Sequence, residues 1–228
     1  MTATRTARRS LVLAAVVCRA SIEMNAADPE AEALHVRVID WLTHLNLWDE
    51  VEPDEQVLLR SLLGQLNSSS VIQASWFVEG LAVLAWALRL LDFPQFGEQV
   101  DLYAVTDAVW FLDDAAQDVV ASAELRGPAE LDACRELLYA VHSRLRDFAR
   151  NKHHEDITRW IEKSWLDLLD LDASAIIVND DLAIDGKTIS EVETSRLQEF
   201  ESIICQRHRA IIWLLEGPER YSEVTVDT

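Results

Sequence analysis

The sequence is poor in positive charge. Its 228 residues include 20 lysines and arginines against 40 aspartates and glutamates, which gives a net charge of −20. Basic side chains supply most of the affinity for nucleic-acid phosphates and for anionic lipid headgroups, so this balance argues against both as partners. The acidic surface instead favours solubility or a basic partner protein. The composition leaves the oligomeric state open.

Cysteine is also scarce. Cys18, Cys134 and Cys205 lie far apart and form no Cys-x-x-Cys pair. Neither a disulfide framework nor a zinc site is therefore indicated. Single cysteines within apolar helical patterns are typical of a reduced, cytoplasmic protein, and we expect that location.

The N-terminal region could be interpreted as an export signal. Arg8 and Arg9 precede an apolar run over residues 11–18, but Arg19 ends this run after only eight residues. Leu11, Ala15, Cys18 and Ile22 share one face of a helix, as they would in a helix docked on a core. We expect the docked helix.

Long apolar runs and catalytic motifs are missing as well. The most apolar stretch, residues 76–88, is too short to cross a bilayer and carries Glu79. There is no glycine-rich phosphate loop, no Gly-x-Ser-x-Gly turn and no Cys–His nucleophile pair. The acidic and histidine clusters at 113–114 and 153–156 lack the spacing of metal ligands. We expect no cofactor, no metal ion and a non-catalytic protein rather than an enzyme.

What the sequence does contain is helical periodicity. It predicts a mainly α protein, one helical domain spanning residues 1–228. The segment at about 70–91 has apolar residues on nearly all sides, which predicts a central helix wrapped by the others.

One short region departs from this helical pattern. Near 176–189, Asp185-Gly186 separates two short apolar runs, which predicts a small β-hairpin because its turn needs positive φ. Ser190 and Glu193 then predict a capping box for the last helix.

Two distant segments echo each other. Residues 37–42 and 209–214 both run from arginine to Trp-Leu, and an aromatic-acidic turn follows each. The second copy continues through Tyr221 to Asp227. The echo predicts that the C-terminal residues are part of the fold.

Four segments resemble a bacterial family known only as domain of unknown function 4272. They are residues 19–23, 76–88, 181–186, and the stretch from Arg207 to the closing Asp227-Thr228. One departure is Ile212, where the family pattern has asparagine before the tryptophan. The resemblance implies a single-domain, mainly helical protein and implies no activity.

Glu79 is the first candidate site residue, because a carboxylate inside the most apolar helix needs a partner. The structural interpretation is a buried ion pair with Arg207 or Arg209, which would tie the last helix to the central one. The functional alternative is a carboxylate that lines a pocket and serves as an acid or base.

His208 completes this candidate pocket or buried polar cluster of Glu79, Arg207, His208 and Arg209. We interpret His208 first as a half-buried structural histidine. Trp48, in a turn after a helix, is the candidate partner contact. The sequence thus favours an acidic protein-binding module, of the immunity or scaffold type. The alternative is a small-molecule-binding protein or hydrolase with a pocket near Glu79, His208 and Tyr103.

Overall fold

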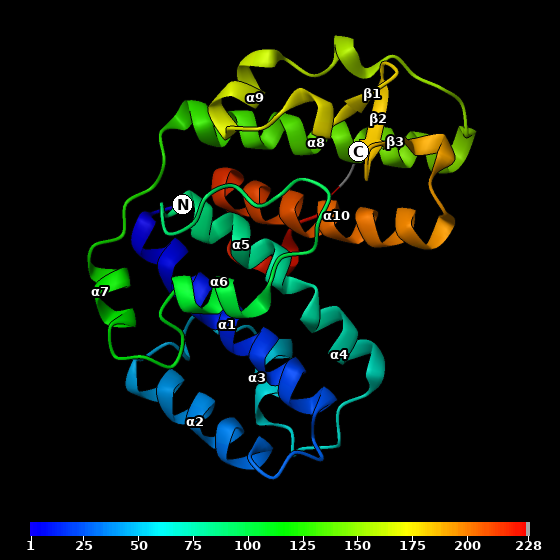
Figure 1. Cartoon of the computed structure of the whole chain (residues 1–228). Coiled ribbons are helices and arrows are strands. Elements are labelled where there is room, and N and C mark those ends of the chain that lie inside the picture. The colour runs from blue at the N-terminus through cyan, green and yellow to red at the C-terminus, as the bar shows by residue number, and fades with distance from the viewer. Residues whose placement is uncertain (227–228) are drawn as a thin grey trace. The chain divides into compact units, whose positions relative to one another are not determined.

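The computed structural model describes residues 1–226 and is mainly helical, with three short β-strands (Figure 1). The predicted fold class is therefore confirmed. The chain divides into two compact units: unit 1 is Met1–Leu91 with Asp101–Leu125, and unit 2 is Asp92–Val100 with Arg126–Thr228. The single domain over residues 1–228 stays a prediction.

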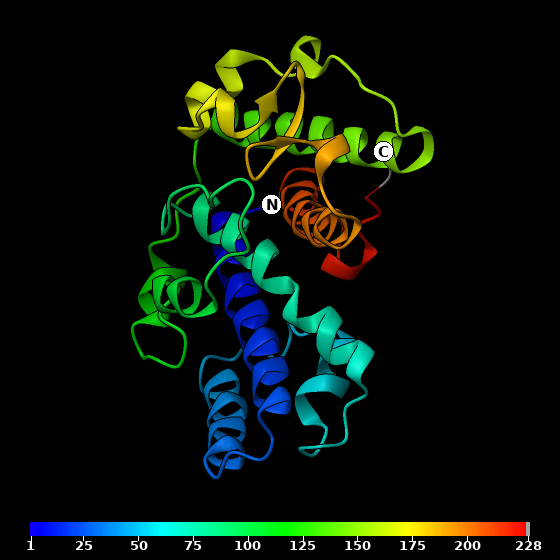
Figure 2. The same ribbon diagram turned by 45° about the vertical axis from the view of Figure 1, so that its right-hand side comes forward.

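Unit 1 is built around its first helix, α1 (Ala3–Met24). Leu11, Leu13 and Val16 are fully buried, as expected for a helix docked on a core. Figure 2 shows the other helices of this unit arranged about α1. They are α2 (Ala31–His44), α3 (Pro53–Arg60), α4 (Ser68–Ser75), α5 (Phe77–Ala87), α6 (Leu102–Ala108) and α7 (Ala116–Ala121).

The predicted central helix at 70–91 consists of two helices, α4 and α5, which meet at a turn at Trp76. Every residue from Val78 to Ala87 is buried, so the prediction of a helix apolar on all sides is right for α5. Within the described residues, Ser68–Ala87 is apolar and long enough to cross a membrane, but 67% of its most apolar window is buried in the structure.

A buried arginine joins α1 to the turn before α3. The Arg9 guanidinium is 1% exposed and donates to both carboxylate oxygens of Glu55 and to the carbonyl of Glu50. Glu55 also accepts from the backbone N–H of Glu52 and so caps α3, which begins at Pro53. One carboxylate thus starts a helix and neutralises a buried cation.

Unit 2 contains the two longest helices of the described residues, α8 (Pro128–Asn151) and α10 (Thr194–Glu216), with 24 and 23 residues. α8 packs along α10, and α9 (Lys163–Leu169) packs on α8. Figures 1 and 2 show α9 and the strands on the opposite side of α8 from α10. α10 ends at Gly217, whose φ of +70° is the left-handed conformation that glycine adopts most readily.

The sheet of unit 2 has three antiparallel strands: β1 (Ile177–Val178), β2 (Asp181–Ile184) and β3 (Lys187–Thr188). The predicted hairpin is confirmed, with Asp185 and Gly186 at φ +54° and +72° in a two-residue turn. A second hairpin, not predicted, turns at Asn179-Asp180, where φ is also positive.

The predicted capping box of Ser190 and Glu193 is wrong. Thr188 and Glu191 form the box instead, with Glu191 accepting from the backbone N–H and the hydroxyl of Thr188. This box begins a short 3-10 helix, Ile189–Glu191, before α10 starts at Thr194. α10 itself follows Glu193, whose side chain makes no capping hydrogen bond.

Three further 3-10 turns complete the unit: Ile157–Arg159, Ala173–Ala175 and Tyr221–Glu223. In the last of them the buried Tyr221 ring lies 5.9 Å from that of Trp213. The C-terminal residues are therefore part of the fold, as the echo predicts. Asp227 and Thr228 lie outside the described residues.

Candidate functional site

Glu79 is fully buried in α5, within unit 1. Arg207 and Arg209 lie on α10, within unit 2, so the predicted ion pair would join the two units and stays a prediction. Arg207 itself is fully buried and donates to the carbonyls of Gln95 and Glu98, at 2.9 and 2.7 Å. It thereby fastens segment 92–100 to unit 2.

His208 is more deeply buried than predicted, at 2% exposed, and it is paired. Its Nδ1 lies 3.2 Å from Nδ1 of His142 on α8, and the His142 residue is 4% exposed. The Tyr139 ring also lies edge-to-face with His208, with centroids 6.1 Å apart. Sequence reasoning missed this pair, because its members are 66 residues apart.

Burial controls the charge of this histidine pair. Burial, together with the proximity of Arg146 to His142 and of His142 to His208, lowers the pKa of each imidazole to about 4. Both rings are neutral at pH 7. One Nδ1–H therefore donates to the Nδ1 of the other ring, which fixes the tautomers relative to each other.

A surface hollow of about 380 Å³ opens over His208. It is lined by Arg135, Glu136, Tyr139, His208, Ile212, Glu216 and Thr225. Charged side chains of both signs and a neutral imidazole therefore face one concave surface between α8 and α10.

A second hollow, of about 320 Å³, lies on the α9 side of α8. We call it the aromatic groove, and it is lined by Glu136, Tyr139, Ala140, Ser143, Trp160 and Trp165. Tyr139 is 49% exposed and Trp160 is 37% exposed. Glu136 and Tyr139 line both hollows, so the two adjoin along one face of α8.

The sequence contained a weak signal for Tyr139. The buried stripe of α8 includes Leu138 and Val141, and Tyr139 falls off that stripe on the exposed side. An apolar aromatic on the polar face of an amphipathic helix indicates a contact surface. The convergence of Trp160 and Trp165 on it depends on how η1 (Ile157–Arg159) and α9 fold back, which no local pattern reveals.

The other predicted residues are placed separately. Trp48 is half-buried; its Nε1 donates to the Thr43 hydroxyl, and the Arg60 guanidinium stacks 4.6 Å from the ring centroid. Tyr103 is 74% exposed on α6 of unit 1, whereas His208 lines the hollow of unit 2. Over residues 1–226, no group of three or more His, Cys, Asp and Glu side chains is arranged to hold a metal ion.

Comparison with known proteins gives a family and no function. No curated protein and no solved structure matches the chain. One family model matches residues 1–159, which covers unit 1, segment 92–100 and α8. The resembling segments at 19–23 and 76–88 fall inside this match, and those at 181–186 and after Arg207 fall beyond it. The chain belongs to the family described as Domain of unknown function (DUF4272).

Proposed function

We propose that the protein is a non-catalytic, cytoplasmic binding module, of the immunity or scaffold type, whose acidic surface holds a basic partner protein. The net charge of −20 supports a partner of opposite charge. Rim charges of this kind speed association and select partners, whereas buried aromatic anchors supply most of the affinity.

The observation that carries the proposal is the aromatic groove. Trp, Tyr and Arg are the residues most enriched among the strong contacts of protein interfaces. Here Tyr139, Trp160 and Trp165 line one concave surface, with Arg135 beside it. Large aromatic rings at a solvent-facing hollow provide contact area at a low cost in conformational entropy.

A pull-down from a lysate of the source organism tests the proposal, with tagged wild type and Tyr139→Ala as baits at two salt concentrations. We expect a stoichiometric basic protein with wild type at low salt. It should be depleted at moderate salt, because surface charge attraction is screened, and depleted with Tyr139→Ala. Recovery of no partner, or of an acidic one insensitive to salt, contradicts the proposal.

The hollow over His208 favours a second candidate, a small-molecule-binding protein or hydrolase. His208 contacts His142 through Nδ1, so its Nε2 is the nitrogen that would meet a ligand. A neutral imidazole beside Arg135 and Glu216 resembles the convergent polar groups of ligand pockets. Glu79 belongs to unit 1, and its part in such a pocket stays a prediction.

Thermal-shift screening of metabolites separates the two candidates. A ligand that raises the midpoint of wild type but not of His208→Gln supports the pocket. A screen in which no compound shifts wild type, together with a salt-sensitive basic partner, supports the binding module.

A further inference from the structure

We propose that the aromatic groove of unit 2 receives a cationic side chain, a lysine or arginine, of the basic partner. The inference rests on the proposed function and deepens it, because it names the site and the chemistry of recognition. It is carried by the juxtaposition of three aromatic rings, one carboxylate and one unpartnered hydroxyl around the same hollow.

The aromatic rings favour a cation. The face of an aromatic ring carries partial negative charge, so an ammonium or guanidinium group within about 6 Å of a tryptophan or tyrosine centroid is attracted to it. Tyr139, Trp160 and Trp165 line the same groove of about 320 Å³, which has room for a long cationic side chain. Aromatic cages of this composition are the usual way in which proteins bind alkylated ammonium groups.

Glu136 adds a full negative charge to the groove. The Glu136 carboxylate accepts from Arg135 at 2.6 Å, and 39% of the Glu136 side chain is exposed. Arg135 also lies 3.7 Å from Asp132, a second carboxylate on the same helix. An incoming cation can therefore share Glu136 while Arg135 keeps a counter-charge.

Ser143 supplies a hydrogen-bonding group. Its Oγ is buried and has no hydrogen-bond partner, although the residue lines the groove one helical turn beyond Tyr139 and Ala140. A buried polar atom without a partner costs free energy. Rotation of the Ser143 side chain toward the groove would let an ammonium or guanidinium N–H donate to this oxygen.

The surroundings of the groove have matching charge. The segment that carries the two tryptophans, residues 155–167, contains four acidic residues and two basic ones. The acidic members are Glu155, Asp156, Glu162 and Asp167. This locally acidic segment attracts a basic surface and repels an acidic one, which favours a cationic occupant over an anionic one.

Isothermal titration of the full chain with synthetic hexa-arginine tests the inference, with hexa-citrulline as a probe of the same shape without the charge. We expect hexa-arginine to bind and hexa-citrulline to bind at least about tenfold more weakly. Trp160→Ala and Glu136→Gln should each weaken hexa-arginine binding about fivefold or more, as loss of a cation–aromatic contact or of a counter-charge implies.

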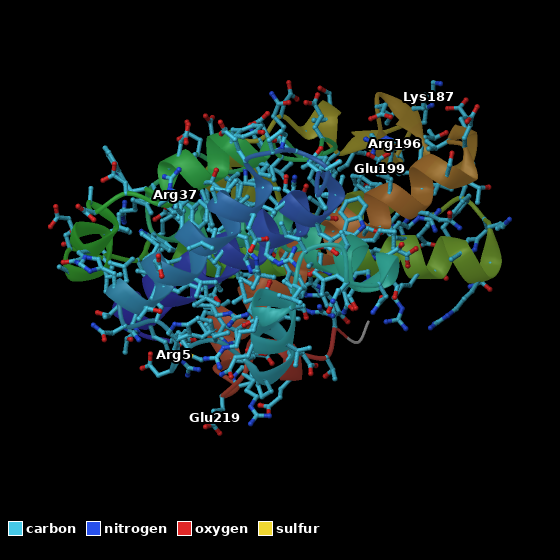
Figure 3. The ribbon with its side chains drawn as sticks, turned by 90° about the horizontal axis from the view of Figure 1, so that it is seen from below. Arg5, Arg37, Lys187, Arg196, Glu199 and Glu219 are labelled. Atoms are coloured by element: carbon cyan, nitrogen blue, oxygen red, sulfur yellow. The ribbon has the colours of Figure 1, made fainter. Side chains whose placement is uncertain are left out.

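Two matched variants control for general effects. Trp110→Ala removes a tryptophan that is 51% exposed in unit 1. Glu199→Gln removes a carboxylate 43% exposed and 3.2 Å from Arg196, a pair comparable to Glu136 and Arg135 (Figure 3). Both should bind hexa-arginine as wild type does. Circular dichroism confirms that every variant is folded, and Glu136→Gln preserves side-chain shape if Trp160→Ala does not fold.

The outcomes distinguish failure of the cation-site inference from failure of the proposed function. If hexa-arginine binds wild type and both groove variants equally, a cationic side chain does not occupy the groove, and the acidic binding module stands without it. If hexa-arginine does not bind wild type even at low salt, the inference and the proposed function both fail. Equal binding of hexa-citrulline also overturns the inference.

Discussion

Several arginines of this protein are buried with specific partners. Arg144 on α8 is fully buried, and its Nε and Nη2 donate to the two oxygens of Asp181 at 2.7 and 2.8 Å. Burial on its own would raise the pKa of Asp181, but the hydrogen bonds from Arg144 and from backbone N–H groups hold it below its ordinary value. The pair ties α8 to the first residue of β2.

Breaking this pair should be costly. Asp181→Asn leaves the buried Arg144 charge with Asp147 as its remaining carboxylate partner among residues 1–226, and removal of one partner of a buried pair typically costs about 3–5 kcal/mol. We expect a loss of about 3 kcal/mol in the free energy of unfolding, measured by urea denaturation. The half-exposed pair of Arg196 and Glu199 is the control, because Glu199→Gln should cost less than about 1 kcal/mol. Equal effects would contradict the assignment.

The histidine pair predicts a pH dependence. The pKa of both His142 and His208 is about 4 in the fold, against an ordinary value of 6.5. As pH falls below 6.5, the unfolded chain takes up protons that the folded protein does not, so stability is full above pH 6.5 and decreases until about pH 4. We expect the unfolding midpoint of wild type to fall by ~3 °C or more between pH 7 and 5.

The comparison that isolates the pair is the double variant His142→Gln, His208→Gln. It should show a flatter dependence over the same interval, because neither site can titrate. Paired carboxylates such as Asp181 lose their contribution only at lower pH, so they do not obscure the result. A double variant with the slope of wild type would exclude these histidines as the cause.

At the residue scale, the sequence predicted which side chains are buried more readily than which residues they contact. It predicted that Glu79 is buried, and the structure agrees. It did not suggest that Arg9 would pair with Glu55, 46 residues later, or that His142 would meet His208. Such pairs depend on which helices pack together, and helical periodicity specifies the buried face without specifying its neighbour.

At the scale of elements, α1 carries the core of unit 1. Leu13 is fully buried in the middle of it. Leu13→Ala should lower the free energy of unfolding by about 2–5 kcal/mol, because it removes buried methyl groups and leaves a cavity. Chemical denaturation measures this, with Leu62→Ala as the control at a leucine 64% exposed, where we expect about 0.5 kcal/mol or less. A negligible effect at Leu13 would mean that α1 is not an integral part of the core.

Elements were predictable where local chemistry decides them. The Asp185-Gly186 turn was predicted because glycine accepts positive φ without steric cost. The Asn179-Asp180 turn has the same geometry but no glycine, so its signal was weaker. The division of the 70–91 segment at Trp76 was not predicted. Tryptophan is not a residue that ends helices, and the Trp76 backbone stays near the helical region.

At the scale of the whole molecule, the family match stops within unit 2. A chain ending at residue 159 would retain α8 but lose α9, the sheet and α10. α9 and α10 pack on α8, whose buried residues include Leu131, Leu137, Leu138, Val141 and Leu145. We expect this truncated chain to aggregate, because a contiguous apolar stripe would be exposed. Size-exclusion chromatography with light scattering checks this, and a monodisperse monomer would show that residues 160–228 are dispensable for solubility.

Segment 92–100 bears on the order in which the two units can fold during synthesis. It is synthesised between two parts of unit 1, yet the arginine that fastens it, Arg207, follows Gln95 by 112 residues. At a translation rate of about 5–20 residues per second, the segment waits roughly 6–20 s for that side chain. All of unit 1 has been made by residue 125, so it can fold on the ribosome around a loop whose partner does not yet exist. Unit 2, in contrast, is complete only after α10 has been made, so α8 leaves the ribosome before the helix that packs along it.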